Sequence, residues 1–473
     1  DLYNKDIEDI AKANEIINGI RLCDPAVGSG HFLVSALNEI INVKYELGIL
    51  TDKQGKRIKK QDYAIEVSND ELIVSDSDGN LFEYIPGNPE SQRIQEALFS
   101  EKQTIIENCL FGVDVNPNSV MICRLRLWIE LLKNSYYTKE SNFADLETLP
   151  NIDIDIKCGN SLLHRFDIDT DLKEILRQSG VSIPEYKKAV ADYKNAPNKE
   201  KKKEIYRIIA SIKSTLRTEV AKKDKKQTTL TKKRKELVDL ESPQLFEFTA
   251  KEIKARQKEA KKLREEIATL DAYFEEIKTN KIYLGAFEWR LEFPEVLSED
   301  GEFMGFDLVI GNPPYIQLQK MGKEADALEL MSYETFVRTG DIYCLFYELA
   351  IDILKPNGWL SFITSNKWMR AGYGETMRKF FVGQTNPVCL IDFAGYKVFD
   401  SATVDVNIMV AQKASYAGET MSCVIDKANF RIEKMSEFTE QNLMPNKFTY
   451  ESWVVLSPIE QSIKSKMIEL VSP

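Results

Sequence analysis

The sequence has few of the residues that build metal centres and disulfide frameworks. It contains two histidines, His31 and His164, and its seven cysteines show no C-x-x-C spacing. We therefore expect neither a metal site nor a disulfide framework, and scattered cysteines of this kind fit a reducing cytoplasm. No apolar run approaches the roughly 18 residues that a membrane-spanning helix needs, so we also expect no membrane association.

Basic residues are also scarce relative to acidic ones. The chain of 473 residues has 63 Lys and Arg against 74 Asp and Glu, which gives a formal net charge of −11. Net charge averages over the whole surface, and a basic cleft can coexist with an acidic exterior. The balance is therefore only weak evidence against nucleic-acid binding. It also fits a chain whose main DNA-gripping part lies elsewhere.

Strand patterns and helix patterns alternate along most of the chain. Short apolar runs at 20–23, 306–310 and 359–364 predict buried strands, and amphipathic helical patterns separate them. This alternation predicts an α/β fold with a doubly wound, mostly parallel sheet. The polar stretch 50–90 carries hairpin signals, and we interpret it as an inserted excursion.

Residues 181–282 have a different composition, dense in Lys and Glu. Apolar residues such as Ile205, Ile208 and Ile212 recur there at helical spacing, which predicts a pair of long antiparallel helices. These helices could form a basic arm on DNA or a solvated hairpin. The interleaving of lysines with glutamates favours the hairpin. After residue 415 the alternation weakens, and we expect a further domain to begin there.

A glycine-rich turn, "DPAVGSG" at 24–30, lies between the first strand and the helix that follows it. Gly28 and Gly30 let the backbone approach a ligand closely, and the helix N-terminus offers free N–H groups to a carboxylate or a phosphate. The turn is not a Walker loop, because no Gly-Lys-Ser/Thr follows it. A tight strand-to-helix turn without a ligand is the alternative interpretation.

Polar residues end the next two strands. Asp114 stands where an acidic residue commonly binds ribose hydroxyls, although a helix N-cap is an equally plausible role. It lies 84 residues after Gly30 instead of the usual offset of about 20, and the excursion can absorb the difference. Asn160 can both donate and accept hydrogen bonds, which suits an adenine edge, but Asn is also a common turn residue.

The segment "GNPPYI" at 311–316 ends the strand 306–310. Each proline removes a backbone N–H and fixes φ near −65°. Asn312 precedes Pro313, so its backbone is pushed toward extended geometry. The result is a stiff elbow that carries an amide, bare carbonyls and an aromatic ring. It stands at the carboxyl end of a strand, where ligands bind in open α/β sheets.

These features occur in the order glycine turn, acid, amide and NPPY. In this order they resemble the S-adenosylmethionine-dependent DNA amino-methyltransferases, specifically the gamma-class adenine-N6 group. The resemblance covers residues 1–175 and 284–415, and it is most specific in "DPAVGSGHFL", "NCLFGVDVNP", "FEWRLEFPEV" leading into "FDLVIGNPPYI", and "LKPNGWLSFITSNKW". The chain is similar to the methyltransferase part of type IIG restriction-modification enzymes and to phage-defence methylases.

The resemblance implies a Rossmann-like methyltransferase fold with a long helical insertion, and it implies roles for individual residues. Those implied to hold the cofactor, S-adenosylmethionine, are Asp24, Ala26, Gly28, Gly30, Phe32, Asp114, Val115 and Asn160. The implied catalytic residues are Asn312, Pro313, Pro314 and Tyr315, and Phe399 is implied to face the flipped base. Without the resemblance, Phe399 would be interpreted as a core aromatic.

The implied reaction transfers a methyl group to the N6 amine of an adenine flipped out of double-stranded DNA. The amine is a poor nucleophile because its lone pair is delocalised into the ring. The Asn312 side-chain oxygen and the Pro313 carbonyl can accept from its two N–H groups and localise the lone pair. Tyr315 and Phe399 can sandwich the base. Stacking of this kind is worth about 1–3 kcal/mol per base, comparable to the few kcal/mol that flipping costs.

Three other functions stay open. Cytosine-N4 methylation uses the same amide-and-proline chemistry on another exocyclic amine. The chain could instead be a non-catalytic DNA-binding subunit of a defence complex, although intact site residues argue against it. An NAD-dependent oxidoreductase would share the glycine turn and the acid, but it would leave NPPY unexplained.

The resemblance also predicts how the chain is organised. The cofactor half of the core is expected at 1–180, the helical insertion at 181–283, the catalytic half at 284–415, and the start of a truncated target-recognition region at 416–473. A nuclease domain or subunit of the same system is an implied partner. We expect the chain to be a central piece of a longer protein that, by itself, binds cofactor weakly and methylates DNA poorly.

Overall fold

The structure is a computed structural model that describes most of the chain. The described residues are 7–147, 155–164, 182–194, 199–223, 225–242, 250–279, 285–399, 404–425, 430–432, 435–457, 459–460, 462–463 and 466–467. The sequence pattern predicts a helix over residues 1–20, and its residues 1–6 lie outside the described ones, as do residues 280–284 near the end of the expected insertion. The structure divides into two compact units, residues 1–162 with 305–473 and residues 163–304.

The first unit is built on a nine-stranded sheet of order β11-β10-β8-β9-β7-β6-β1-β4-β5. Its strands are β1 (Leu22–Asp24), β4 (Leu110–Asp114), β5 (Ile156–Cys158), β6 (Phe306–Gly311), β7 (Leu354–Ser365), β8 (Asn386–Asp392), β9 (Val406–Gln412), β10 (Thr420–Val424) and β11 (Met444–Asn446). From β5 to β7 every neighbouring pair is parallel, whereas β9 runs antiparallel to both β7 and β8. The predicted α/β class with a mostly parallel sheet is confirmed.

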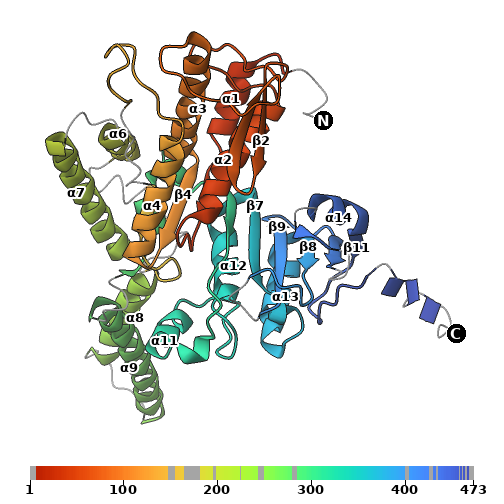
Figure 1. Cartoon of the computed structure of the whole chain (residues 1–473). Coiled ribbons are helices and arrows are strands. Elements are labelled where there is room, and N and C mark those ends of the chain that lie inside the picture. Colours follow the sequence, from red (N-terminus) through yellow and green to blue (C-terminus); the bar gives the residue numbers. More distant parts are fainter. Residues whose placement is uncertain are drawn as a thin grey trace. The chain divides into compact units, whose positions relative to one another are not determined.

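Helices link the parallel strands of this unit in two directions. The chain moves outward from β1 through α2 (His31–Glu46) to β4, and then through α4 (Pro117–Leu132) to β5. From β6 it moves the other way, through α12 (Tyr343–Ile353) to β7 and through α13 (Glu375–Gln384) to β8. Because such crossovers are right-handed, the two sets of helices cover opposite faces of the sheet. Figure 1 shows red and orange elements sharing this sheet with cyan and blue ones, so both ends of the chain build it.

The reversal of direction lies between β1 and β6, which pair in parallel at Leu22 with Leu308 and at Cys23 with Val309. A crevice outside the carboxyl ends of strands at such a switch point is where open α/β sheets bind ligands. The glycine turn follows β1 and the NPPY segment follows β6. The two most specific motifs of the sequence therefore leave neighbouring strands at the same edge.

Helix starts follow local sequence signals. The helices α3 (Pro89–Asn108) and α4 both begin with an Asn-Pro pair, in which the Asn side chain caps the helix and the proline occupies the first turn. Asn116 accepts from the backbone N–H of Asn118 at 2.9 Å. The proline costs no hydrogen bond there, because the first helical N–H groups have no partner within the helix. A short helix α1 (Ile10–Asn18) precedes β1.

The excursion 50–90 contains a separate two-stranded antiparallel sheet, β2 (Tyr63–Ser68) with β3 (Glu71–Asp76). Its tight turn has Asn69 and Asp70 at positive φ, which Asn and Asp tolerate better than most residues. Ile65 of β2 belongs to a buried apolar cluster with Leu37 and Ile41 of α2. The hairpin predicted from the polar turn residues is present, and it packs on the core through one apolar face.

Strand β7 starts earlier than the sequence indicated. The "KPNG" segment predicts a turn before a strand at 359–364, but β7 runs over Leu354–Ser365 and includes that segment. Asn357 has φ of 64°, and its N–H donates to the carbonyl of Lys413 at 3.0 Å. The pairing with β6 shifts register between Phe306 and Leu308. The turn residues are thus absorbed as an irregularity at the start of a long strand.

Residues after 415 extend the same sheet. Strand β10 pairs in parallel with β8, and β11 pairs antiparallel with β10 after the short helix α14 (Met435–Asn442). The assignment of 416–473 to a target-recognition region stays a prediction. None of the described helices is both long and apolar enough to cross a bilayer.

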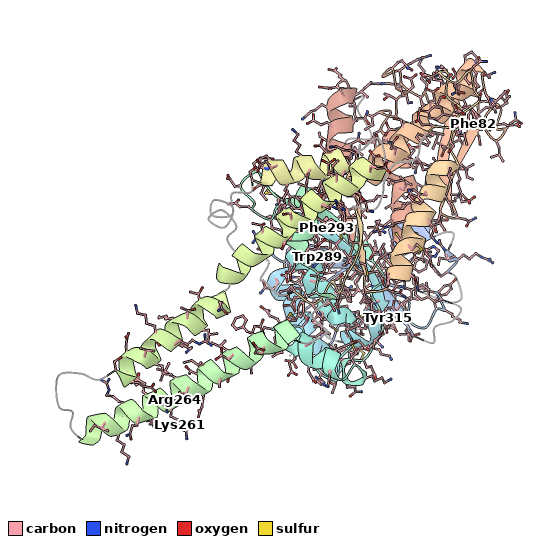
Figure 2. All side chains as sticks on the ribbon, turned by 90° about the vertical axis from the view of Figure 1, so that its left-hand side faces the viewer. Phe82, Lys261, Arg264, Trp289, Phe293 and Tyr315 are labelled. Atoms are coloured by element: carbon pink, nitrogen blue, oxygen red, sulfur yellow. The ribbon has the colours of Figure 1, made fainter. Side chains whose placement is uncertain are left out.

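The second unit is helical. Its helices are α6 (Ile183–Lys194), α7 (Lys199–Lys223), α8 (Lys225–Glu241), α9 (Ala250–Thr279) and the short α10 (Trp289–Glu292). Figure 2 shows α8 and α9 side by side, with Lys261 and Arg264 on α9. Lys233 pairs with Glu266 at 2.6 Å across this hairpin. The sequence predicted one antiparallel pair, whereas α6 packs on α7 and α8 packs on α9.

Candidate active site

Asp24 ends β1 and is almost completely buried at the switch point. Its Oδ1 accepts a hydrogen bond from the backbone N–H of Ala26 at 3.0 Å, which shapes the first step of the glycine turn. Burial, with a smaller contribution from the charge of Asp114, raises the pKa of Asp24 from 3.8 to about 7. An ionised carboxylate at this buried position loses its hydration, which costs free energy. A cationic group of a ligand would offset that cost.

The glycine turn depends on backbone conformations that favour glycine. Gly28 has φ of 52° and Gly30 has φ of 84°. A side chain at Gly30 would also clash with α4, because a Cβ atom would lie 2.5 Å from Cys123 Sγ. The N–H of Gly28 donates to Asp114 Oδ2 at 2.9 Å, so this turn is bonded directly to the end of the neighbouring strand.

Asp114 therefore has both carboxylate oxygens oriented by backbone groups. Oδ2 accepts from Gly28, and Oδ1 accepts from the N–H of Asn116 at 2.7 Å. Each oxygen keeps further lone pairs that can accept from hydroxyl groups. Val115, the next residue, is 66% exposed and offers an apolar surface beside the carboxylate. The helix cap that the sequence allowed for Asp114 is provided by Asn116 instead.

Asn160 lies just beyond β5, in a turn that the structure ties to both neighbouring turns. Its Oδ1 accepts from the N–H of Leu162 at 3.1 Å, so part of its hydrogen-bonding capacity shapes the turn. The N–H of Gly159 donates to the carbonyl of Asp114 at 2.9 Å. Ser161 Oγ donates to the carbonyl of Pro25 at 2.6 Å. Ser161 was missed in the sequence, where nothing marks a serine beside a turn as a link to a segment 136 residues away.

The remaining candidates on the cofactor side lie on the same turn and helix. Ala26 is half-buried within the glycine turn, and Phe32 is half-buried in the first turn of α2. Hydrogen bonds and close approach thus bring together three strand ends, those of β1, β4 and β5, as the sequence predicted. Among the described residues no cluster of His, Cys, Asp and Glu could hold a metal ion.

Gly311 joins the NPPY segment to Asp24. A Cβ atom at position 311 would lie 2.7 Å from Asp24 Oδ1 and 3.1 Å from its Cγ. Because such contacts are not tolerated, only glycine lets β6 pass this close to the carboxylate. In the sequence, the only signal for this role of Gly311 is its place directly before Asn312.

Asn312 presents a polar atom without a described partner. Its Oδ1 is buried and accepts no hydrogen bond from any described residue. A buried acceptor left in this state costs about 1–3 kcal/mol, so it is retained only where something else requires it. Pro313, which follows, is buried, and its ring cannot supply a competing donor.

Tyr315 is held by contacts on two sides. Its hydroxyl donates to the carbonyl of Ile363 on β7 at 3.3 Å, and its ring meets that of Tyr343 edge-on with centroids 5.9 Å apart. Burial raises the pKa of Tyr315, so the hydroxyl stays protonated at neutral pH. The chain after it is fixed by an N–H···O bond of 2.9 Å from Ile342 to Ile316.

Phe399 lies far from Tyr315 in sequence but packs on the same apolar cluster. Both side chains are half-buried against a group that includes Ile391, Phe393 and Val406. The structure therefore brings together the two aromatic residues that the resemblance singled out. Phe399 is partly buried against this core cluster, so its burial does not separate a core aromatic from one that faces a base, and its role stays a prediction.

The arrangement has the features of a site for a nucleoside-bearing methyl donor next to a second, aromatic site. Positive φ at Gly28 brings backbone close to the crevice, a fixed carboxylate faces it at Asp114, and an apolar side chain flanks it at Val115. These groups suit a ribose and a base. The Asn312 oxygen, which has no partner among the described residues, follows β6, and two aromatic side chains pack on one apolar cluster. The strand order and this site define the class as a Rossmann-like methyltransferase.

Comparison with known proteins agrees with this class. The family model described as Eco57I restriction-modification methylase matches residues 108–399, and the model described as MmeI, DNA-methyltransferase domain, matches residues 3–206. Because the first match covers more than half of the chain, the chain belongs to the Eco57I restriction-modification methylase family.

Individual relatives are longer than this chain. RM.MjaORFECS2P of Methanocaldococcus jannaschii, a candidate type II restriction enzyme and methyltransferase, is 26% identical over 84% of this chain and 30% of its own length. The type II restriction enzyme and methyltransferase RM.Eco57I of Escherichia coli is 25% identical over 34% of this chain and 16% of its own. The structure of the type IIL restriction-modification enzyme MmeI with DNA aligns with a TM-score of 0.39, 10% identity, and coverage of 94% of this chain and 36% of that one. A TM-score at this level carries no argument.

Proposed function

We propose that the chain transfers a methyl group from S-adenosylmethionine to the N6 amine of an adenine flipped out of double-stranded DNA. The observation that carries this proposal is the buried Oδ1 of Asn312 at the switch point, which has no hydrogen-bond partner in the described part of the chain. An exocyclic amine needs an acceptor in that place, and a stiff proline-flanked segment keeps the acceptor available.

The donor would be held by the residues at the ends of β1, β4 and β5. Asp114 would accept from the ribose hydroxyls, Val115 would lie against the adenine, and Asn160 would meet the adenine edge. Asp24, with Ala26 and the two turn glycines, would hold the methionine end, whose ammonium group offsets the buried carboxylate. When bound, S-adenosylmethionine supplies an electrophilic methyl group on a sulfonium.

The acceptor side belongs to the segment after β6. The Asn312 side-chain oxygen and the Pro313 carbonyl would each accept from one N–H of the amine and localise its lone pair. Tyr315 and Phe399 would stack on the two faces of the flipped base, since both pack on one cluster. Transfer then needs alignment more than acid–base chemistry, and the amine proton leaves to solvent.

We further propose that the parent system restricts foreign DNA. A nuclease domain of a longer chain, or a separate subunit, would cut the same sites when they are unmethylated. Both relatives described above are named as restriction enzyme and methyltransferase, and this chain spans only 30% and 16% of their lengths. The setting of such a system is the cytoplasm, where the host DNA lies.

The test is methyl transfer from labelled S-adenosylmethionine to unmethylated genomic DNA, which offers many different sites. With the enzyme in excess over the DNA sites, even a slow rate of methyl transfer can be measured. Asn312→Ala should lose at least about 100-fold in rate, because it removes a preorganised group at the reacting centre. The matched control is Asn108→Ala, an exposed position at the end of α3, which should leave the rate unchanged. Equal rates in Asn312→Ala and the wild type would refute the proposed role of the amide.

A further inference from the structure

A second buried carboxylate stands at the sheet edge, at the end of β8. Asp392 is 0% exposed, and its Oδ1 accepts from Asn366 Nδ2 at 2.8 Å and from the N–H of Ala394 at 3.0 Å. Its other oxygen, Oδ2, is buried and has no hydrogen-bond partner among the described residues. A buried carboxylate satisfied on only one oxygen requires a cation nearby.

Arg370 is the cation that faces it. A terminal guanidinium nitrogen of Arg370 lies 3.8 Å from Asp392 Oδ2, near enough for attraction but too far for a hydrogen bond. The Arg370 side chain is 61% exposed, whereas that of Asp392 is 1% exposed. A guanidinium has five N–H groups in a flat fork. The buried carboxylate of Asp392 therefore attracts Arg370 from the protein side, while the guanidinium N–H groups remain available to an anion on the solvent side.

The pair stands beside the proposed base site. Arg370 follows η5 (Asn366–Met369), which begins directly after β7, and β7 carries the Ile363 carbonyl that accepts from Tyr315. Phe393, next to Asp392, belongs to the cluster on which Tyr315 and Phe399 pack. Through Asn366 and Ala394, Asp392 also fixes the loops after β7 and β8 to each other.

Other cations lie on the same loops. Lys320 follows β6, Lys367 lies in η5, and Lys397 follows β8; all three are exposed and have no ion-pair partner within the described part of the chain. On the neighbouring helix α13, by contrast, Lys379 pairs with Glu375 at 2.6 Å. We call Lys320, Lys367, Arg370 and Lys397 the edge cations. They lie on the loops that follow β6, β7 and β8 at the carboxyl edge of the sheet, in a chain whose net charge is −11.

We propose that Arg370, oriented by Asp392, binds a backbone phosphate of the DNA strand that carries the flipped nucleotide. Two parallel N–H···O bonds would hold the phosphate, while the lysines among the edge cations add attraction without fixed geometry. Fixing a phosphate next to the flipped base would hold the strand in place during transfer. This inference rests on the proposed function, since it assumes that the strand reaches this edge.

The experiment measures binding of a fluorescently labelled, mixed-sequence DNA duplex at several salt concentrations. Arg370→Ala should weaken binding about tenfold, as expected for a charge-assisted pair of bonds, and should reduce the slope of log affinity against log salt by about one. Arg370→Lys should keep the slope but lose affinity, because a lysine binds as a point charge without the fork. Asp392→Asn should also lose affinity with the slope unchanged: the Asn oxygen can still accept from Asn366 and from the N–H of Ala394, but the charge that orients Arg370 is gone.

Lys379→Ala is the matched control, because its ion pair within α13 occupies its charge, and it should change neither quantity. Thermal melting of each variant separates lost binding from lost folding. Unchanged affinity and slope in a folded Arg370→Ala protein overturn the inference, and so does a wild-type chain that binds no duplex. Methyl transfer distinguishes the two proposals: loss in Asn312→Ala with none in Arg370→Ala leaves the proposed function standing and this inference refuted.

Discussion

Asp24 is a buried carboxyl group, and its proposed role at the donor site requires it to be ionised. The folded state raises its pKa to about 7, while the unfolded chain has the ordinary value of 3.8. The folded protein therefore binds the proton more tightly, and the contribution of this carboxyl to stability falls as the pH rises through that window. Without a cationic ligand, the ionised Asp24 should make the free energy of unfolding above pH 7 lower than it would be with an uncharged side chain at this position.

Asp24→Asn should consequently be more stable than the wild type in the absence of ligand. Its advantage in free energy of unfolding should grow by about 2 kcal/mol between about pH 5.5 and 8, because only the wild type must ionise a buried group. Urea unfolding at a series of pH values measures this difference. The exposed Asp62→Asn should show no such trend. An advantage that stays constant with pH would contradict the account of Asp24.

The sequence reveals residues that belong to a motif better than residues whose role depends on burial and on distant contacts. Asp24, Asp114 and Asn312 were found because each follows a strand pattern within a recognisable segment. Asp392 was not, because its significance lies in the absence of a partner for one oxygen, and burial of that kind depends on Asn366 and Arg370 from another loop. Gly311 was missed as a contact for the same reason, since Asp24 lies 287 residues before it.

At the scale of elements, the α3–α4 pair is held by a buried ion pair as well as by apolar contact. Lys102 Nζ donates to the carbonyl of Glu130 at 3.0 Å and lies 3.3 Å from its Oε2. The two side chains are 2% and 8% exposed. Burial lowers the pKa of Lys102, although the charge of Glu130 opposes the shift. Glu130 also pairs with Lys133 at 2.7 Å, so it keeps one cationic partner if Lys102 is removed, while its backbone carbonyl loses the hydrogen bond from Lys102.

Lys102→Ala should therefore lower the free energy of unfolding by about 1–3 kcal/mol, the cost of leaving a buried acceptor without its donor. Lys12→Ala is the matched comparison: Lys12 and Glu15 are 2.8 Å apart on α1 but are 60% and 71% exposed, so solvent screens the pair and its loss should change stability little. Denaturant unfolding of both variants gives the two values. Similar small losses in the two would mean that the α3–α4 pair adds little to stability.

Element types were more predictable than element boundaries. The glycine turn, the helix His31–Glu46 and the strand Phe306–Gly311 follow directly from local pattern. The "KPNG" segment was misjudged because Leu354 already pairs with Phe306 of β6, and the segment between Leu354 and Trp359 is accommodated where the register shifts. The insertion was misjudged because a helical period shows that helices form but not where a long Lys/Glu-rich run divides between them.

At the scale of the whole molecule, the two compact units should melt separately. Each has its own core: the helical unit includes the rings of Phe287, Trp289 and Phe293, with Phe287 and Trp289 centroids 4.9 Å apart; Figure 2 labels Trp289 and Phe293. Every residue proposed to hold the donor, by contrast, lies in the sheet-containing unit. A ligand stabilises only the cooperative unit that binds it.

Scanning calorimetry should show two unfolding transitions. Saturating S-adenosylmethionine should raise the midpoint temperature of only one of them. At 100 times the dissociation constant, the ligand adds about 2.7 kcal/mol to the stability of the unit that binds it. Asp114→Ala should abolish the shift while leaving the other transition in place. A single transition, or equal shifts in both, would show that the two units unfold together.

The central claim is that this chain methylates the N6 amine of adenine through the Asn312 oxygen. The most direct measurement is mass spectrometry of nucleosides from unmethylated DNA after incubation with the chain and S-adenosylmethionine, for the wild type, Asn312→Ala and Asn108→Ala. The account predicts N6-methyldeoxyadenosine with the wild type and with Asn108→Ala, and little or none with Asn312→Ala. N4-methyldeoxycytidine in its place, or equal yields from all three proteins, would contradict the account.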